Sequence, residues 1–315
     1  MDMYDVVAVG ELLIDFTPAG VSDRGAALFA RNPGGAPANV LAAVTRLGGR
    51  TAFIGKVGED GFGRFLRDTL GGLGIDTAGL VMTGEVPTTL AFVQLDEHGD
   101  RSFSFYRKPG ADIMLSPGEV KRELMARARI MSRSATLAAV RAAKEAGAVV
   151  SYDPNYRPLL WESLDEAKHW MREGLSFADI VKVSDEELEL LTGETDLERG
   201  SQKLVEAGVS LALVSLGARG AFFRLGELCG RQPTFDVRTV DTNGAGDSFF
   251  GAVLFRLCKK SLAEIRSLTR GELEDVLSFG NAAGSMTTTR PGAIPALPTM
   301  EEVLACRAHT PLLLK

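Results

Sequence analysis

The chain has 315 residues, 45% of them hydrophobic and 24% charged, with a formal net charge of −6. This composition is that of a globular protein, and without a basic face it argues against a nucleic-acid partner. Three cysteines lie far apart without a CxxC pair, so neither a disulfide framework nor a zinc site is implied, which suits a reducing cytoplasm.

The chain begins as an alternation of short apolar strands and helices. Residues 1–5 lead straight into a strand and no apolar run reaches ~18 residues, so we expect neither a signal peptide nor a membrane span. Strands are predicted at 6–10 and 51–57, and helices at 40–49 and 60–73. The pattern then changes to a β-hairpin with arms 90–95 and 102–106 around a turn at 97–100. With part of 12–29, this hairpin predicts a small separate sheet.

Strands and helices alternate again in the second half. The strands are predicted at 148–153, 180–183, 211–216, 221–225 and 234–240. The helices are predicted at 164–175, from 184 onwards, at 249–257 and at 273–287. Such alternation favours a doubly wound sheet, whose ligands bind beyond the carboxyl ends of the strands.

The most informative segment is a glycine-rich turn at 241–247, directly before an apolar helix. Gly244, Ala245 and Gly246 leave its backbone almost free of side chains, so a ligand can approach closely. Free N–H groups and the macrodipole at the helix N-terminus favour an anion, and Asp247 lies beside it. An anion site next to a carboxylate suits phosphoryl transfer to a hydroxyl. The structural alternative is a tight turn whose acid only favours the dipole.

A second glycine cluster, at 32–39, also leads into an apolar helix, and Asn39 is placed to hydrogen-bond a polar ligand. Alone, it has the structural alternative of a Pro-Gly turn. Together and in this order, the two segments resemble the two signatures of the ribokinase-like (PfkB) carbohydrate kinases, with the resemblance running from 6 to 298. It implies one α/β kinase domain over 1–315, with a ribokinase-like doubly wound, mostly parallel sheet flanked by helices. It also implies a small β-sheet lid from about 12–30 and 87–108, ATP and Mg²⁺ as cofactors, and a small sugar as substrate.

The expected chemistry depends on positioning and charge neutralisation, because phosphoryl transfer is loose. We expect the backbone N–H groups of Asn243, Gly244, Ala245 and Gly246 to hold the transferring phosphate. Asp247 is expected to accept the proton of the sugar hydroxyl. A carboxylate at a helix N-terminus should be acidic and hence a poor base, which a late proton transfer tolerates.

On the sugar side, Asp15 follows the first strand and is expected to take two adjacent hydroxyls. The resemblance gives matching positions this role, with Gly34, Gly35 and Asn39 closing the same wall. Three further residues are expected to reach the cleft: Tyr106, Arg107 and Arg157. The alternatives are a surface acid on a turn for Asp15 and solvated positions for the arginines.

On the nucleotide side, Ser184 and Glu187 occupy the places of an Asn-x-x-Glu motif common in the family. There the pair helps to place magnesium and phosphate, partly through water, although a capping box would use the same residues. Lys182, on the strand before, could approach a phosphate. The resemblance implies further nucleotide contacts at Ser215, Gly217, Gly220, Asn243 and Asn281, and a candidate site for a monovalent cation such as K⁺ at Asp241 and Thr288.

The segment 104–112 resembles bacterial fructokinases, so we expect ATP-dependent phosphorylation of D-fructose at O6. The alternatives are a 2-keto-3-deoxygluconate kinase, whose acid substrate would use Arg107 and Arg157, and a ribokinase or nucleoside kinase. The non-enzyme alternative is a sugar-binding sensor or inactive paralogue. A homodimer through the lid is also predicted, because a small sheet with an exposed apolar face is poorly stable alone.

One stretch departs from the family pattern. Residues 117–129 and 134–146 both read as helices, with only Ile130 and Met131 between them. Ribokinase-like kinases have a strand here, followed by a loop that often touches the sugar. Either the chain lacks this strand or the sequence omits residues at this point. The first alternative, together with Ser184 in place of Asn, motivates the sensor hypothesis.

Overall fold

The computed structural model describes residues 3–95, 101–133 and 137–314, and its largest element is a nine-stranded sheet. The strand order is β13-β12-β11-β10-β9-β8-β1-β4-β5. The strands from β11 to β5 in this order run parallel to one another. Strand β12 pairs antiparallel with β11, and β13 pairs antiparallel with β12. Their bounds are β1 Tyr4–Val9, β4 Thr51–Gly58, β5 Asp76–Thr83, β8 Ala128–Arg133, β9 Val149–Tyr152, β10 Ile180–Ser184, β11 Leu211–Ser215, β12 Ala221–Leu225 and β13 Leu228–Gln232.

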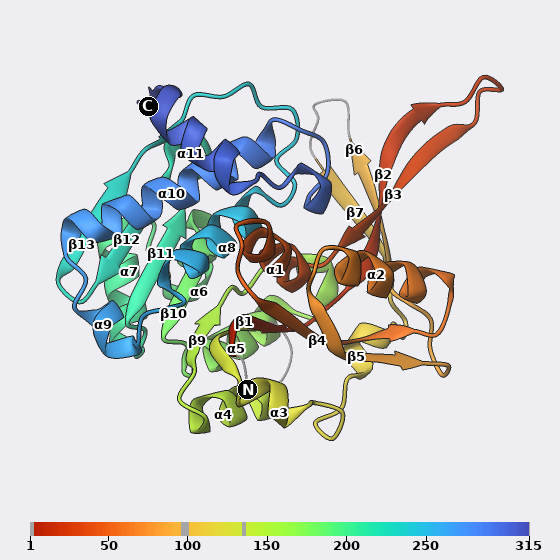
Figure 1. The fold of residues 1–315 in the computed structure, drawn as a ribbon, viewed down its shortest axis with the longest axis horizontal. Helices are drawn as coiled ribbons and strands as arrows, with labels where there is room; N and C mark the ends of the chain where they lie inside the picture. Colours follow the sequence, from red (N-terminus) through yellow and green to blue (C-terminus); the bar gives the residue numbers. More distant parts are fainter. Residues whose placement is uncertain (1–2, 96–100, 134–136, 315) are drawn as a thin grey trace.

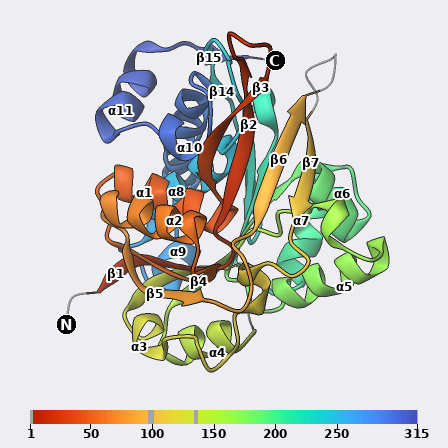
Figure 2. The ribbon, with the colours of Figure 1, turned by 90° about the vertical axis from the view of Figure 1, so that its right-hand side faces the viewer.

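Helices cover both faces of this sheet (Figures 1 and 2). On one side lie α1 Ala36–Arg46, α2 Gly61–Gly72, α8 Ala245–Leu257, α9 Leu262–Arg266, α10 Arg270–Thr288 and α11 Met300–His309. On the other lie α3 Arg122–Met125, α4 Leu137–Glu145, α5 Leu164–Leu175, α6 Asp185–Thr192 and α7 Leu197–Glu206. Along β1, Val6 packs into one core and Val7 into the other, as strand alternation requires. The predicted doubly wound α/β fold is confirmed.

A smaller sheet projects from the body beside α2 (Figure 1). Its strand order is β3-β2-β6-β7, with β2 Leu13–Val21, β3 Ala27–Gly34, β6 Leu90–Leu95 and β7 Arg101–Tyr106. The predicted hairpin arms correspond to β6 and β7, while its predicted turn at 97–100 lies outside the described residues. A two-stranded ribbon, β14 Thr234–Phe235 with β15 Leu312–Leu313, completes the strands that the structure describes. None of the helices in the described ranges is long and apolar enough for a membrane crossing.

The expectation of a missing strand near Ile130 is wrong. Strand β8 fills the position between β1 and β9, with Ile130 opposite Val6 and Val149. The preceding helix shrinks to α3, because Glu119 accepts a hydrogen bond from Ser116 N and pairs with Lys56 Nζ at 2.7 Å. These contacts fix a turn against β4 where the sequence suggested a helix. The apolar centre of β8 is only two residues long, so its neighbours in the sheet define it.

The structure also differs from the predicted strands elsewhere in the main sheet and beside it. The strand predicted at 234–240 is limited to β14, after which the chain runs in irregular backbone towards the glycine turn. Strands β5 and β13 were not predicted, and both lie at the edges of the sheet. Edge strands are partly exposed, so their sequences lack the continuous apolar run of the buried parallel strands.

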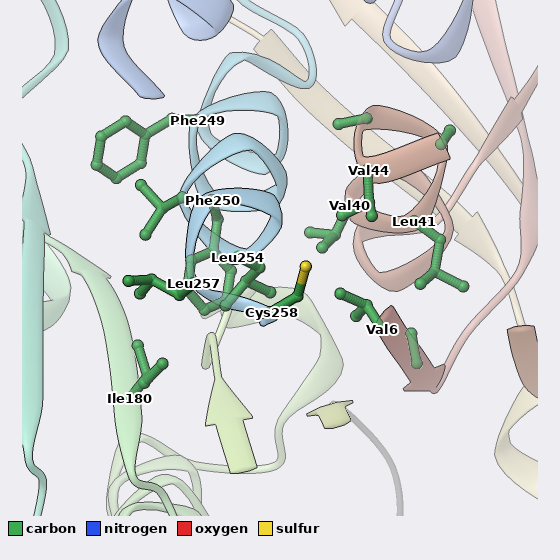
Figure 3. Packing of buried hydrophobic residues seen from close by; sticks show 14 of the residues in the cluster. Val6, Val40, Leu41, Val44, Ile180, Phe249, Phe250, Leu254, Leu257 and Cys258 are labelled. Atoms are coloured by element: carbon green, nitrogen blue, oxygen red, sulfur yellow. The ribbon is translucent and has the colours of Figure 1, made fainter. Parts of the chain in front are cut away.

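Helices α1 and α8 lie side by side (Figure 3). This arrangement brings the two glycine turns together. A Cβ built on Gly251 of α8 would lie 2.7 Å from both Ala43 Cβ and Val40 O of α1. Only glycine permits this approach without a shift of the backbone. Asn39, just before Val40, contacts Asp247, four residues before Gly251. The two helices therefore run in the same direction, with both N-termini at one site.

Candidate active site

Asp247 lies in the first turn of α8, where the two glycine turns meet. Its Oδ2 accepts a hydrogen bond of 2.9 Å from Asn39 Nδ2, across 208 positions of sequence. The Oδ1 of Asn39 is buried and has no hydrogen-bond partner among the described residues. A buried amide oxygen without a partner is costly unless a ligand donates to it. The pair thus orients a carboxylate and presents an acceptor at the same place.

Asp247 and Asn39 line a cavity of about 320 Å³ between the smaller sheet and the carboxyl ends of β1 and β9. The cavity is strongly polar, with three carboxylates and two guanidinium groups. Its lining residues are Glu11, Leu13, Asp15, Gly35, Ala36, Asn39, Phe105, Arg107, Pro154, Asn155, Arg157, Leu160, Trp161, Asn243 and Asp247. Side chains that both donate and accept hydrogen bonds suit a polyhydroxylated ligand.

The structure brings together most of the residues predicted for the sugar side. Asp15, Gly35, Asn39, Arg107 and Arg157 all line this cavity. Gly34 has a supporting place, since a Cβ there would lie 2.1 Å from Asp15 Oδ2 and displace that carboxylate.

Tyr106 does not line the cavity. Its side chain is 67% exposed, and its ring packs 5.5 Å from the ring of Phe92. Neighbouring residues of a strand point to opposite faces, so Phe105 lines the cavity instead. Strand alternation was the signal that could have found it.

Arg107 is fixed at the cavity wall by a buried carboxylate. Its guanidinium pairs with Asp112, which also accepts a hydrogen bond from Thr89 Oγ1. Asp112 is buried, and its side chain connects Thr89, just before β6, with Arg107, just after β7. Charge-assisted pairs of this kind hold their geometry well. Arg107 therefore lines the cavity with the charge of its guanidinium already balanced by Asp112.

A buried ion pair lies beneath the anion turn. Lys182 Nζ is 2.9 Å from Asp153 Oδ2, and both residues are buried. A Cβ on Gly246 would lie 3.2 Å from the same Nζ, so the ammonium is directly under the turn. Burial lowers the pKa of Lys182, but Asp153, Glu187 and Asp247 outweigh it and raise the pKa, which keeps the ammonium charged. Burial likewise raises the pKa of Asp153 against the opposing charge of Lys182.

The pKa of Asp247 departs from the expectation for a helix N-terminus. Burial raises its pKa, and Glu187 adds to the rise, while Lys182, the hydrogen bond from Asn39 and Arg157 oppose it. The net direction is upward, because loss of solvation outweighs these favourable contacts. Asp247 is thus a stronger base than its place in the sequence suggested.

Glu187 and Ser184 form a capping box at the start of α6. Ser184 Oγ accepts from Glu187 N at 3.1 Å, and Glu187 Oε2 accepts from Ser184 N at 2.8 Å. The other oxygen, Oε1, accepts from Tyr156 N at 2.7 Å. The capping box that was the alternative role of Ser184 and Glu187 is therefore present in the structure. Glu187 also connects α6 to the loop after β9 that carries Arg157.

A second cavity, of about 460 Å³, lies on the other side of the glycine turn. It is lined by small, hydroxyl-bearing and apolar residues: Ser215, Gly217, Ala218, Gly220, Thr234, Phe235, Val237, Thr239, Thr242, Ala245, Gly246, Phe249, Asn281, Gly284, Ser285, Thr288 and Leu313. Four residues predicted for the nucleotide lie here, namely Ser215, Gly217, Gly220 and Asn281. Lys182, Ser184 and Glu187, which were also predicted for the nucleotide, are not among the lining residues, and Asn243 lines the first cavity.

Asp241 and Thr288 fasten the glycine turn to the end of α10. Asp241 Oδ1 accepts from Asn243 N and Oδ2 from Gly292 N, both at 2.8 Å. The carbonyl of Thr288 accepts from Val240 N at 2.7 Å and from Asp241 N at 3.1 Å. The two residues predicted to share a cation thus lie together. Their oxygens already accept hydrogen bonds from backbone N–H groups in and beside the turn.

Several lining residues were missed from the sequence. Glu11 follows β1 and its Oε1 accepts from Ala36 N at 3.1 Å, which holds the start of α1. Asn155 and Trp161 lie in the segment that follows β9. A polar residue directly after a parallel strand is the signal that was available, because these ends meet at one edge of the sheet.

Comparison with known proteins identifies the family of this chain. The family model described as pfkB family carbohydrate kinase matches residues 3–300. Fructokinase-1 of Zea mays is 46% identical over 315 residues, covering 95% of this chain and 96% of the maize protein. The crystal structure of fructokinase from Xylella fastidiosa with bound ATP has a TM-score of 0.88 at 35% identity and covers 96% of this chain and 98% of its own. A fructokinase double mutant from Vibrio cholerae, with fructose, ADP and potassium ion bound, has a TM-score of 0.84 at 32% identity over 97% and 99% of the two chains. The chain therefore belongs to the pfkB family of carbohydrate kinases.

Proposed function

We propose that the protein transfers the γ-phosphoryl group of ATP to O6 of D-fructose. One observation carries the proposal: a single glycine turn separates two cavities and contributes to both. Asn243 and Asp247 line the polar cavity, and Thr242, Ala245 and Gly246 line the other. A hydroxyl in the first cavity would face a phosphate in the second across this turn. The fructokinase relatives support fructose as the acceptor.

In the proposed reaction, Asp247 takes the proton of the O6 hydroxyl while that oxygen bonds to phosphorus and ADP leaves. Asn39 holds one carboxylate oxygen in place. The backbone N–H groups of the turn would donate hydrogen bonds to the oxygens on which negative charge develops, and the ammonium of Lys182 beneath the turn would also stabilise this charge. Burial raises the pKa of Asp247, which favours proton acceptance.

Magnesium fits the charge of this site. Three carboxylates, Asp153, Glu187 and Asp247, surround the single ammonium of Lys182, so the cluster is negative. The described residues contain no group of three or more ligands that would hold a metal alone. Mg²⁺ usually keeps several waters and binds through phosphates, and Glu187 would hold it through water. When bound with ATP, it would neutralise phosphate charge.

We keep a monovalent cation at Asp241 and Thr288 as a proposal. Its support is the fastening of both residues to the glycine turn and the potassium ion of the Vibrio cholerae structure. A cation here would stiffen the turn. Turnover should rise when K⁺ replaces a bulky organic cation at constant ionic strength, and equal rates would contradict the proposal.

A neutral sugar suits the polar cavity better than the acid 2-keto-3-deoxygluconate. Arg107 is already neutralised by Asp112, and Arg157 donates to Tyr156 O and Asn155 Oδ1. An acid substrate would also face Glu11, Asp15 and Asp247. We therefore expect fructose to be turned over faster, and Arg157→Ala to retain most fructose turnover. Preferred phosphorylation of the acid, abolished by Arg157→Ala, would reverse the assignment.

Ribokinase, nucleoside kinase and sensor activities are separated by one panel. Thermal-shift measurements with fructose, ribose and nucleosides, with and without Mg-ATP, are followed by detection of ADP and of the phosphorylated product. We expect stabilisation by fructose and ADP release with fructose. The sensor hypothesis depended partly on a missing strand near Ile130, but this strand is present as β8. Stabilisation without ADP release would still support a sensor.

We further propose that residues 1–315 act as one kinase domain in the cytoplasm and associate as a homodimer through the lid. The described cysteines are free, which suits a reducing compartment. The lid exposes Val21, Leu28 and Phe29, and exposed apolar strands favour pairing. Light scattering should give a dimer at micromolar concentration, and Phe29→Lys should weaken it. A monomeric wild-type protein would contradict this association.

A further inference from the structure

The chain after α11 returns to the nucleotide cavity. Helix α11 ends at His309, and Thr310 is extended because Pro311 follows. The next residues form β15, which pairs antiparallel with β14 in the register Thr234 to Leu313 and Phe235 to Leu312. Asp236 N donates to Pro311 O at 2.9 Å and closes the ribbon. Figure 2 shows β14 and β15 together near the C-terminus. Strand β15 lies beyond residue 300, where the family match ends.

The ribbon is attached to α10 at a distance from the glycine turn. Thr234 Oγ1 and Ser285 Oγ are 2.7 Å apart, and Asn281 Nδ2 donates to Gln232 O and Pro233 O. The glycine turn, in contrast, is fastened at Thr288. Seven residues of helix separate Asn281 from Thr288, a rise of about 10 Å. The phosphate turn and the ribbon thus stand at opposite ends of the cavity, and the ribbon is at the nucleoside end.

The two leucines of β15 face different surroundings. Leu313 lines the nucleotide cavity together with Phe235, Val237 and Phe249. Leu312 is 42% exposed and lines a separate hollow on the surface with Arg307 and Thr310. This is the alternation expected of adjacent residues in a strand. One residue of the pair can therefore be changed as a control for the other.

We propose that Leu313 is a nucleotide-binding residue, whose side chain forms part of the apolar wall against which the adenine ring of ATP packs. The inference rests on the proposed function, because it assigns the second cavity to ATP. None of the described residues lining this cavity is charged, so the ring is recognised largely by apolar contact. Strand β15 holds Leu313 at that wall through the β14 ladder.

The test measures Mg-ATP binding by calorimetry without sugar, and then steady-state kinetics. Leu313→Asp should weaken ATP binding at least ~10-fold, because it removes a half-buried apolar side chain from the proposed wall and places a carboxylate against the adenine ring. Leu312→Asp should stay within about twofold of wild type, since exposed positions tolerate charge. The KM for fructose should not change in either variant. Thermal unfolding verifies that both proteins are folded.

The inference is overturned if Leu313→Asp binds ATP like wild type, or if both variants lose affinity equally. If Leu313→Asp does not fold, Leu313→Ala decides, with weaker ATP binding expected and unchanged binding refuting the assignment. A wild-type protein that does not bind ATP would refute the proposed function itself, which is a different result.

Discussion

The two cavities beside the glycine turn have different chemical linings. The cavity that we assign to the sugar is lined by three carboxylates and two arginines, whereas no charged side chain is present among the described residues that line the cavity assigned to the nucleotide. Nevertheless the proposed nucleotide carries most of the charge in the reaction. Its phosphates would depend on backbone N–H groups, on the cation that accompanies them, and on Lys182 beneath the turn.

This difference shows what each side must discriminate. Sugars differ in the orientation of their hydroxyls, so a fixed array of charged and amide groups can select among them. A nucleotide offers a flat ring and a phosphate chain, for which an apolar wall and a bare backbone are sufficient. Asp247 contributes to both sides: it lines the cavity assigned to the sugar, and it lies in the first turn of α8, directly after the glycine turn.

The largest expected effect is that of Asp247→Asn, which should abolish most of the turnover while leaving the binding of fructose and of Mg-ATP in place. Asp247→Asn keeps the shape of the side chain but removes the proton acceptor, so turnover should fall at least ~100-fold. Calorimetry should show that fructose and Mg-ATP still bind. Asp112→Asn, which alters a buried carboxylate beside Arg107, is the control and should mainly change fructose KM. Near-normal turnover by Asp247→Asn would remove the assigned base.

The sequence predicted those features of the site that depend on local backbone. Both glycine turns, the helices after them and the segment after β9 that carries Arg157 follow from local spacing, whereas Asp15 lies within β2 rather than in a loop after the first strand. The hydrogen bond between Asn39 and Asp247 could be expected once both turns were assigned to one site.

The features that sequence reasoning missed depend on tertiary neighbours. Strand β8 exists because β1 and β9 leave a place between them. The raised pKa of Asp247 follows from burial, which a helix N-terminus does not reveal. The wall at Leu313 is formed by a strand that lies far from the glycine turn in sequence.

A smaller effect should damage the sugar side and spare the nucleotide side. Gly251→Ala pushes α8 away from Val40 and Ala43, next to Asn39. We expect kcat/KM for fructose to fall about 10- to 100-fold because the reacting groups move apart. The free energy of unfolding should fall by ~1–3 kcal/mol. The Kd for Mg-ATP should change less than the fructose kinetics, because most residues that line the second cavity lie outside α1 and α8.

Gly271→Ala is the matched control, because this helical glycine has nothing within 4 Å of its added Cβ. It should preserve activity and stability. Equal fructose kinetics for the two alanine variants would show that close contact between α1 and α8 does not position the site.

The smallest expected effect concerns the charge under the turn, and it is read from pH dependence. Lys182 lowers the pKa of Asp247, while Glu187 raises it and Arg157 lowers it. In Lys182→Met the pKa of Asp247 rises, so the carboxylate is protonated at a higher pH. The acid limb of kcat should therefore move to higher pH, and turnover at neutral pH should fall ~10-fold. Asp153 loses its partner and can take up a proton instead of remaining a buried charge.

Lys56→Met tests whether this shift is specific to the turn. Lys56 is also a buried lysine on a strand of the main sheet, paired with Glu119 at 2.7 Å. Its loss should reduce the free energy of unfolding by ~1–3 kcal/mol without moving the acid limb. If Lys182→Met keeps the wild-type pH profile, or if both variants shift it equally, the ammonium under Gly246 does not act on Asp247. The negative cluster would then serve stability alone, and the phosphates would depend only on the backbone of the turn and the bound cation.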